Sequence, residues 1–436
     1  TWPLKLEELT FGDTYNYPLH EVCFPKSLRS LSFGQRFHQP LDKARLPENL
    51  ENLVFGESFN CSLEHVLLPV NLKRLIFGDG FKKPLEKVAF PSSLEYLKFG
   101  DGFDRSLKRL TFPNGLLELT LSGIFNKDLM QLQLPQMLRS LTLGRNFNQT
   151  LEHVIWPNQL QNLTFGVWFN QSLEQVTLPS SLRSLTFGFC FDQSLERVNL
   201  PETLESLTFG GGFKKSLANV TLPSSLLSLT LGGPYFKSSH FREMTFPVGL
   251  KSLHFGKLFN DDIASIILPS QLEKLTFGEN FNFPLDKVKF PESLQCLSLG
   301  DKFDQQIDEV QWPNTLKSLS FGDKFNGDVC GVQLPNTLES LSFGDTFQQP
   351  VDYLTLPTTL QELRFGSSFD WPLDHLHLHH LRSLTLGKDF KQSLAALPST
   401  LQTLILESTM IPTDLPILPR TLEVFKCNQL MVKAGP

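Results

Sequence analysis

Apolar and polar residues follow one pattern in this chain, and the pattern repeats every 22 positions. One clear copy spans residues 178–199, and its general form is LPxxLxxLxFGxxFNxxLxxVx. Each copy contains the spacing LxxLxL twice, here at 182–187 and 195–200. The last two apolar residues of each motif alternate at period two, which is typical of a short strand with one face inward. Two strands per copy predict two parallel β walls on opposite sides of a coiled solenoid.

Three further positions predict how each coil turns. Equivalent positions in successive copies of the repeat are called a column below. Pro179 lacks a backbone N–H, so it should end the second strand, and Gly188 should end the first where positive φ or close backbone packing is needed. We expect Phe191 to stack on Phe169 and Phe213 from the adjacent coils, at about 4.8 Å per coil. Asn or Asp follows this Phe in many copies and predicts a side-chain-to-backbone ladder in the turn, for example at Asn148, Asn170 and Asp192.

A copy of 22 residues has no room for a full helix beside two strands and two turns. The chain is therefore predicted to be a β-rich, right-handed, leucine-rich-repeat-like superhelix of about 20 coils. The regular repeat covers residues 1–398, with a two-residue insertion within 233–241, and a degenerate C-terminal segment over 399–436 is expected to act as the cap. At the other end we expect an open sheet edge in the first coil, which favours end-to-end or edge association.

Composition narrows the classes of partner. Hydrophobic residues make up 40% of the chain, enough for a continuous core, which excludes disorder. The net charge is −6, so no basic excess exists for binding a nucleic acid backbone. No apolar run approaches about 18 residues, so no membrane-spanning segment is predicted.

The distribution of the cysteine residues bears on the cellular compartment. The six cysteines are scattered, without a CxxC motif, which favours a reducing, cytoplasmic compartment, although a secreted or surface location remains open. The chain begins with Thr1-Trp2-Pro3, which indicates a removed leader or a fragment.

The segment LTFGVWFNQSLEQVTLPSSL, residues 163–182, resembles the FNIP repeat, a relative of the leucine-rich repeat. It is also similar to the bacterial BspA-like leucine-rich repeats. The resemblance covers residues 1–398 and implies a solenoid with roles in protein interaction or at surfaces. Asn is replaced in several copies, for instance by His38, Lys82 and Lys214.

Candidate chemistry is sparse. The chain has no GxGxxG motif between a strand and a helix, no GxxxxGK[ST] and no HExxH. An active site needs unlike groups that converge, whereas a repeat places like groups in rows. We therefore predict no catalytic residue and no cofactor. A recurring acidic residue after the second-motif Leu, such as Glu64 or Glu174, is interpreted as a solvated edge with weak surface ion pairs.

The strongest candidate site is a local change in the turn after the glycine. Most copies carry polar residues there, whereas two consecutive copies carry an apolar set, and a further aromatic residue lies in the insertion. An aromatic cluster on a turn edge is typical of a protein-binding patch. The alternative is a plug that packs under the insertion. The candidate residues are Val167, Trp168, Phe189, Cys190 and Tyr235.

A second departure is the histidine-rich segment at residues 374–380. If residues 375–378 form a strand, His375 and His377 share its outward face and could ligate zinc or copper, with His379 nearby. The alternative, which we favour, is that these histidines simply decorate an exposed segment. No metal site is therefore predicted.

A third departure is the row of Ser-x-Thr pairs in the first strand, as at Ser184 and Thr186. Flat hydroxyl ladders of this kind resemble ice-binding solenoids, but Val54, Ile76 and Lys98 interrupt the row. Thr is also favoured in any exposed strand. Glycosylation sequons occur at about the frequency expected by chance, at Asn60, Asn148, Asn162, Asn170 and Asn219.

Two functions fit these observations best. The first is a non-enzymatic scaffold that binds another protein through the mid-chain apolar turns. The alternative is a structural or surface-layer element that assembles through its ends. An ice-binding-like protein is a distant third.

Overall fold

The computed structural model describes residues 2–3, 5–130, 132–233, 244–395, 397–407, 418–427 and 430–433, the last of these as backbone alone. The chain divides into two compact units, Thr1–Lys215 and Ser216–Pro436, and each is described here by itself. Among the described residues every regular element is a strand of three or four residues, and no helix occurs. The prediction of a helix-free coiled solenoid is confirmed.

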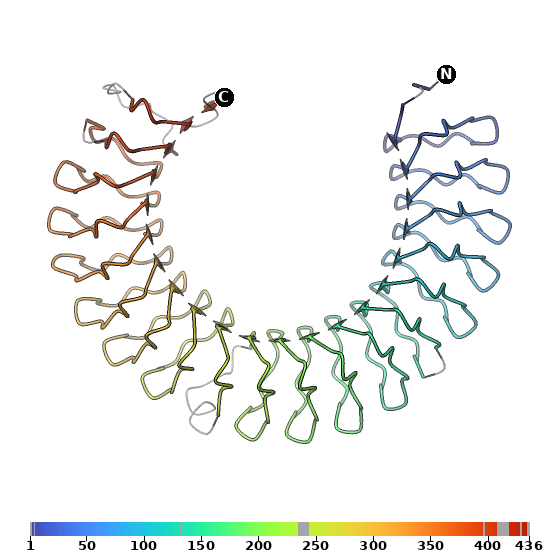
Figure 1. Ribbon diagram of the computed structural model, residues 1–436, viewed down its shortest axis with the longest axis horizontal. Helices are drawn as coiled ribbons and strands as arrows, with labels where there is room; N and C mark the ends of the chain where they lie inside the picture. Colours follow the sequence, from blue (N-terminus) through green and yellow to red (C-terminus); the bar gives the residue numbers. More distant parts are fainter. Residues whose placement is uncertain are drawn as a thin grey trace. The chain divides into compact units, whose positions relative to one another are not determined.

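Each coil contributes one strand, at the place of the first LxxLxL motif (Figure 1). The first unit holds β1 (Glu8–Thr10), β2 (Ser30–Ser32), β3 (Asn52–Val54), β4 (Arg74–Ile76), β5 (Tyr96–Lys98), β6 (Glu118–Thr120), β7 (Ser140–Thr142), β8 (Asn162–Thr164), β9 (Ser184–Thr186) and β10 (Ser206–Phe209). The second unit holds β11 (Ser228–Leu231), β12 (Ser252–Phe255), β13 (Lys274–Thr276), β14 (Cys296–Ser298), β15 (Ser318–Ser320), β16 (Ser340–Ser342), β17 (Glu362–Arg364), β18 (Ser383–Leu386), β19 (Thr403–Leu406), β20 (Val424–Cys427) and β21 (Leu430–Lys433).

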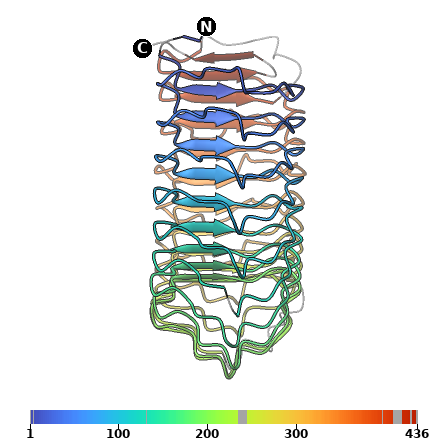
Figure 2. The same ribbon diagram turned by 90° about the vertical axis from the view of Figure 1, so that its right-hand side faces the viewer.

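Strands within a unit pair in parallel, in the register that the 22-residue period dictates. Leu185 of β9 faces Leu207 of β10, so equal positions of the repeat form rows across the sheet (Figure 2). The degenerate C-terminal copies continue this sheet, because β19 pairs in parallel with both β18 and β20. The exception is β21, which turns back and pairs antiparallel with β20.

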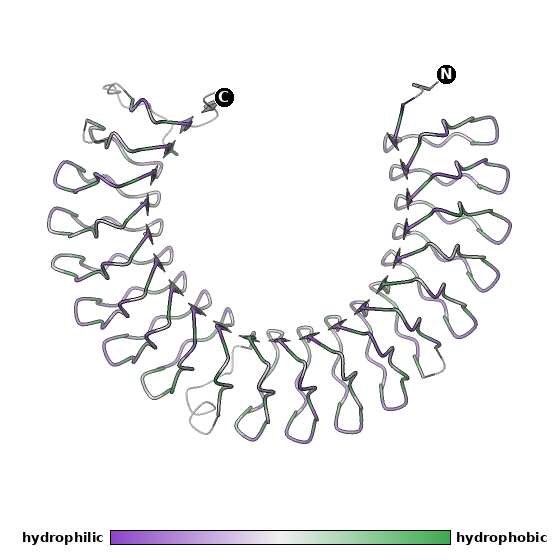
Figure 3. Cartoon of the chain, viewed as in Figure 1, coloured by the Kyte–Doolittle hydropathy of each residue, from purple (hydrophilic) through white to green (hydrophobic). Residues whose placement is uncertain are grey.

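The core is built from the inward residues of the repeat. Leu182, Leu185 and Phe187 of one coil are buried, and so is Phe191 of the following turn. Phe191 stacks on Phe169 and Phe213, which confirms the predicted aromatic spine, but the ring centroids are 6.0 Å apart in both pairs, wider than the predicted spacing of about 4.8 Å per coil. Each coil alternates between hydrophobic and hydrophilic segments, as Figure 3 shows.

The ring spacings also show which way each unit curves. Hydrogen-bonded strands lie about 4.8 Å apart. Phe165 and Phe187, next to the sheet, have centroids 5.4 Å apart, whereas Phe169 and Phe191, one turn further on, are 6.0 Å apart. The coils therefore fan apart with distance from the sheet, which places the strands on the concave side of each unit.

The prediction of a second β wall is wrong. The second motif, residues 195–200 in the clear copy, contains a turn at residues 196–197 and forms no strand, and its equivalents among the described residues form no strand either. Its rings lie further apart than the rings beside the sheet, since Phe290 and Trp312 have centroids 6.3 Å apart and Phe165 and Phe187 only 5.4 Å. The backbone makes local hydrogen bonds there instead, such as the one from the Val198 N–H to the Leu195 carbonyl at 3.0 Å. Each unit therefore has one β wall.

Close packing, and not positive φ, explains the glycine column. A Cβ on Gly188 would lie 1.9 Å from the carbonyl oxygen of Gly166 in the preceding coil. Among the described glycines only Gly331 has a left-handed φ, of 73°. Within the regular repeat of residues 1–398, Ser122 is the one occupant of the column that is not glycine; it is buried, and its hydroxyl donates to the Phe103 carbonyl.

Candidate functional site

The two residues after each column glycine form a turn at one edge of the sheet, called the glycine rim below. Backbone hydrogen bonds join this rim from coil to coil. Trp168 N–H donates to the Arg145 carbonyl at 2.9 Å, Cys190 N–H to the Val167 carbonyl at 2.8 Å, and Gly212 N–H to the Phe189 carbonyl at 2.7 Å. Backbone bonds thus hold the rim in these coils, whereas in other coils a rim carboxylate adds a bond, as Asp79 Oδ1 does by accepting the Asp101 N–H at 2.8 Å.

The four rim residues singled out from the sequence lie in the first unit, in two adjacent coils. Trp168 is 53% exposed and Phe189 is 60% exposed, while Val167 and Cys190 are half-buried. Tyr235, the fifth candidate, lies outside the described residues. The rim patch, defined as Val167, Trp168, Phe189 and Cys190, therefore presents two large aromatic side chains to solvent.

Sequence reasoning missed one further apolar residue on the rim of the first unit, and also Leu258, which is 44% exposed on the rim of the second unit. Ile124 is 44% exposed in the same turn position as Trp168, two coils earlier. The signal was available, because its coil also carries Ser122 in place of the column glycine. Arg145 and Asn146 occupy the rim between Ile124 and the patch, so the apolar surface is interrupted by polar side chains.

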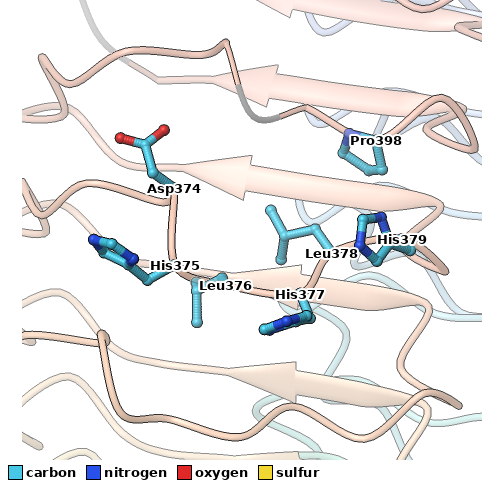
Figure 4. A pocket seen from close by; sticks show the side chains of 7 residues that line it. All are labelled: Asp374, His375, Leu376, His377, Leu378, His379 and Pro398. Atoms are coloured by element: carbon cyan, nitrogen blue, oxygen red, sulfur yellow. The ribbon is translucent and has the colours of Figure 1, made fainter.

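The histidine segment does not form the expected strand. Residues 375–378 lie in a turn and an extended stretch, and the next strand begins at Ser383. His377 and His379 have ring centroids 6.2 Å apart at a steep angle, and Figure 4 shows the side chains of His375 and His377 well apart. Within the described residues no group of three or more His, Cys, Asp or Glu side chains is placed to hold a metal ion.

The groove beside these histidines belongs to the repeat. Asp374, Leu376 and Pro398 line it together with the histidines (Figure 4). Grooves with the same repeat positions occur in other coils, for example along residues 174–180 and 199–201 and along residues 218–224 and 245–249. The fanning of the coils opens all of them, so the groove at the histidines is not a specialised site.

The hydroxyl rows lie on the concave face of the sheet. Ser184 and Thr186 of β9 face Ser206 and Thr208 of β10 in register, and all four are half-buried. A concave array of half-buried hydroxyl groups does not offer the flat surface that suggested ice binding.

Two ladders of polar side chains link the coils. The Asn170 Oδ1 atom accepts the Asp192 N–H at 2.9 Å, and Asn148 does the same for Asn170. The predicted Asn ladder is present, and it joins neighbouring coils. The second ladder was not foreseen: Thr203 Oγ1 lies 2.8 Å from the carbonyl oxygens of both Ser180 and Leu182 in the preceding coil.

Charged side chains also pair between coils. Glu51, directly before β3, accepts hydrogen bonds from Arg29 at 2.5 Å and from Lys73 at 2.9 Å. Hydrogen bonds from Lys73 and then from Arg29 lower the pKa of the Glu51 carboxyl. On the opposite side of the coil Glu64 pairs with Lys87 at 2.6 Å. These pairs are exposed, as expected for a solvated edge, so each contributes little to stability.

A family model of the FNIP repeat matches the chain at residues 3–36, 37–80, 59–102, 81–124, 103–146, 125–167, 147–190, 169–212, 191–234, 240–280, 281–324 and 325–368. The chain belongs to the FNIP-repeat family. The resemblance seen in residues 163–182 is thereby confirmed. No curated protein matches the FNIP-repeat chain.

Solved structures similar to this FNIP-repeat chain are leucine-rich-repeat proteins. CroV588, described as a novel circular LRR protein structure, is 31% identical with a TM-score of 0.71 and covers 92% of this chain and 69% of its own. The functional domain of InlJ from Listeria monocytogenes is 14% identical with a TM-score of 0.40, covering 80% and 71%. A leucine-rich repeat protein from Bacteroides ovatus is 15% identical with a TM-score of 0.20, covering 88% and 82%. The likeness to CroV588 supports the leucine-rich-repeat fold.

All six cysteines are free thiols. In the described part of the FNIP-repeat chain, no helix has the length and apolar character needed to cross a bilayer.

Proposed function

We propose that this FNIP-repeat chain is a non-enzymatic scaffold that binds another protein, and that the rim patch is its contact. The observation that carries the proposal is the exposure of Trp168 and Phe189 on adjacent turns, at 53% and 60%. Polar residues occupy the corresponding turns in most coils, as at Asp79, Asp101 and Lys302. Large exposed aromatic side chains are enriched among the residues that dominate binding energy.

The backbone of the rim supports this assignment. Because N–H to carbonyl bonds of 2.7–2.9 Å hold the turns, the aromatic side chains make no closing contact that the fold requires. They are also presented on a rigid edge, so little conformational entropy is lost when a partner orders them. The occupant that fits is an apolar segment of a partner protein, with Arg145 and Asn146 as the polar margin.

The test is a paired substitution, Trp168→Ala with Phe189→Asp, assayed against a matched control. Leu67→Asp with Val70→Asp is that control, since these residues of the same unit are 92% and 70% exposed and lie outside the rim. Pull-down from native lysate with quantitative mass spectrometry selects partners, and calorimetry with each purified partner then measures affinity.

We expect the rim variant to weaken binding by about tenfold or more, since one anchoring side chain contributes about 2 kcal/mol. The control variant should bind as the wild type does. Circular dichroism and melting temperature should stay unchanged in both variants. Equal affinity of the rim variant and the wild type, or unfolding of the rim variant, would overturn the proposal.

A further inference from the structure

The concave face of the first unit is not uniform. In most coils its last outward strand position carries Ser or Thr, but three consecutive strands, β3, β4 and β5, carry Val54, Ile76 and Lys98. The parallel register places Val54 beside Ile76 and Ile76 beside Lys98. Val54 and Ile76 are half-buried and Lys98 is exposed.

The neighbouring row changes in the same strands. Arg74 of β4 and Tyr96 of β5 face each other in register, and the Arg74 guanidinium carbon lies 3.7 Å from the centre of the Tyr96 ring. This stacking holds the planar guanidinium against the sheet, which leaves its N–H groups to bind an acceptor. The concave patch is defined as Val54, Arg74, Ile76, Tyr96 and Lys98.

Two cations of the concave patch lack an acidic partner. Lys73 and Arg29 next to the patch share one acidic partner, Glu51, at 2.9 and 2.5 Å. Arg74 and Lys98 form no ion pair with any residue that the structure describes. An Arg pre-oriented on an aromatic ring, without its own carboxylate, is suited to bind one supplied by a ligand.

The surrounding charge decides what kind of ligand fits. Glu118 of β6 faces Tyr96 in register. Its carboxylate disfavours an extended polyanion such as a nucleic acid. A short segment with one or two acidic side chains next to aliphatic residues is complementary, since the latter cover Val54 and Ile76.

We propose that the concave patch is a second interaction surface, which binds a protein segment carrying an Asp or Glu flanked by aliphatic or aromatic residues. The carboxylate is bound by Arg74 and Lys98, and the flanking apolar side chains contact Val54 and Ile76. The surface is independent of the rim patch, so either proposal stands if the other fails.

The experiment uses a displayed library of random 12-residue peptides, selected on the purified full chain. Enriched peptides are synthesised in two forms, with the acidic residue intact and with Asp→Asn or Glu→Gln. Their affinities are measured by fluorescence polarisation for the wild type and for three variants: Arg74→Gln with Lys98→Gln, the rim variant Trp168→Ala with Phe189→Asp, and Lys274→Gln with Arg382→Gln. The last is the control, because it removes two exposed cations from the second unit, Lys274 in β13 and Arg382 directly before β18.

We expect acidic residues next to apolar ones to be enriched. Neutralising either the peptide acid or Arg74 and Lys98 should weaken binding by about tenfold or more, since a charged hydrogen bond contributes about 1.5–3 kcal/mol. The rim and control variants should bind within about twofold of the wild type. The proposal is overturned if no acidic peptide is enriched, or if the enriched peptides bind the amide form or the Arg74 and Lys98 variant equally well. The peptide substitution keeps this test valid even if the protein variant misfolds.

Discussion

At the scale of single residues, the repeat is held by contacts that allow almost no change in size. The glycine column packs backbone on backbone, and the Phe columns stack ring on ring. A position of this kind is repeated in each coil because each coil must fit its neighbours in the same way. Substitutions here should therefore affect stability strongly and locally.

Phe191→Ala should destabilise the first unit by about 3–5 kcal/mol, since it removes a fully buried ring from a stack and leaves a cavity. Chemical denaturation monitored by circular dichroism measures the change. Phe189→Ala is the matched control: this neighbouring ring is 60% exposed, and its loss should change stability by less than about 0.5 kcal/mol. Similar effects of the two substitutions would contradict the stacked-core interpretation.

Gly188→Ala should be destabilising by about 1–3 kcal/mol or more, because the new Cβ would meet the Gly166 carbonyl oxygen at 1.9 Å. Gly12→Ala tests the same column where nothing lies within 4 Å of the added atom, and it should be nearly neutral. The melting temperatures of the two variants measure this difference in stability. If both behave alike, close packing is not the reason for glycine in this column.

His254, on the outward face of β12, gives a prediction about pH. Burial, and then the charge of Lys274, lowers the pKa of His254 below its ordinary 6.5. The folded state therefore favours the neutral ring, so this group's contribution to stability is complete above pH 6.5 and is lost as pH falls towards the lowered pKa. Urea unfolding should show a smaller loss of stability on going from pH 7.5 to 5.5 in His254→Gln than in the wild type. Lys274→Gln should reduce that loss only partly, and a His254→Gln variant with the wild-type pH dependence would refute this account.

At the scale of elements, the 22-residue period determined most of the fold that sequence could predict. Leu and Phe columns recur so often that strand, turn and aromatic spine could be placed in nearly every coil. The second wall could not be predicted, because an alternating pattern such as Val198-Asn-Leu200 does not reveal the spacing between coils. The ring centroids of Phe290 and Trp312 lie 6.3 Å apart there, further than those beside the sheet, because the coils fan apart with distance from the strands.

In the absence of a second β wall, ladders of polar side chains join neighbouring coils. Asn170→Ala should leave the Asp192 N–H without its 2.9 Å acceptor, and the loss of one such bond costs about 1 kcal/mol. Hydrogen exchange should speed up at Asp192 and its neighbours. Asn162→Ala, on the concave face, is the control and should leave that exchange unchanged. Unaltered protection at Asp192 in the Asn170 variant would show that the ladder is not needed.

Candidate sites were harder to predict than the fold. The apolar departures at Trp168 and Phe189 could be read directly, because they break a row that is polar in most coils. The strand proposed for residues 375–378 was wrong, since the copy has lost its proline and one residue and its turn is rearranged. The concave patch was not predicted, because the sequence pattern shows Val54, Ile76 and Lys98 only as interruptions of a hydroxyl row. Only the register, and the stacking of Arg74 on Tyr96, showed that they form a surface.

At the scale of the whole molecule, the function follows from what repetition does to chemistry. A repeat arranges equal groups in rows, so a specific site arises where a few coils depart from the rule. The rim patch and the concave patch are such departures, both within the first unit. Membership in the FNIP-repeat family and the likeness to CroV588 establish the leucine-rich-repeat solenoid, and the departures are the places where we propose that a partner binds.

The most direct measurement is site-specific photo-crosslinking in native lysate, with p-benzoylphenylalanine placed at Trp168 in one protein and at Leu67 in another. Both side chains are exposed and apolar, at 53% and 92%, but only Trp168 belongs to the rim patch. If the rim patch is the contact, the Trp168 probe yields a discrete crosslinked partner, which Phe189→Asp abolishes, and the Leu67 probe yields none. Equal crosslinking from both positions, or a partner captured only through Leu67, would contradict the account.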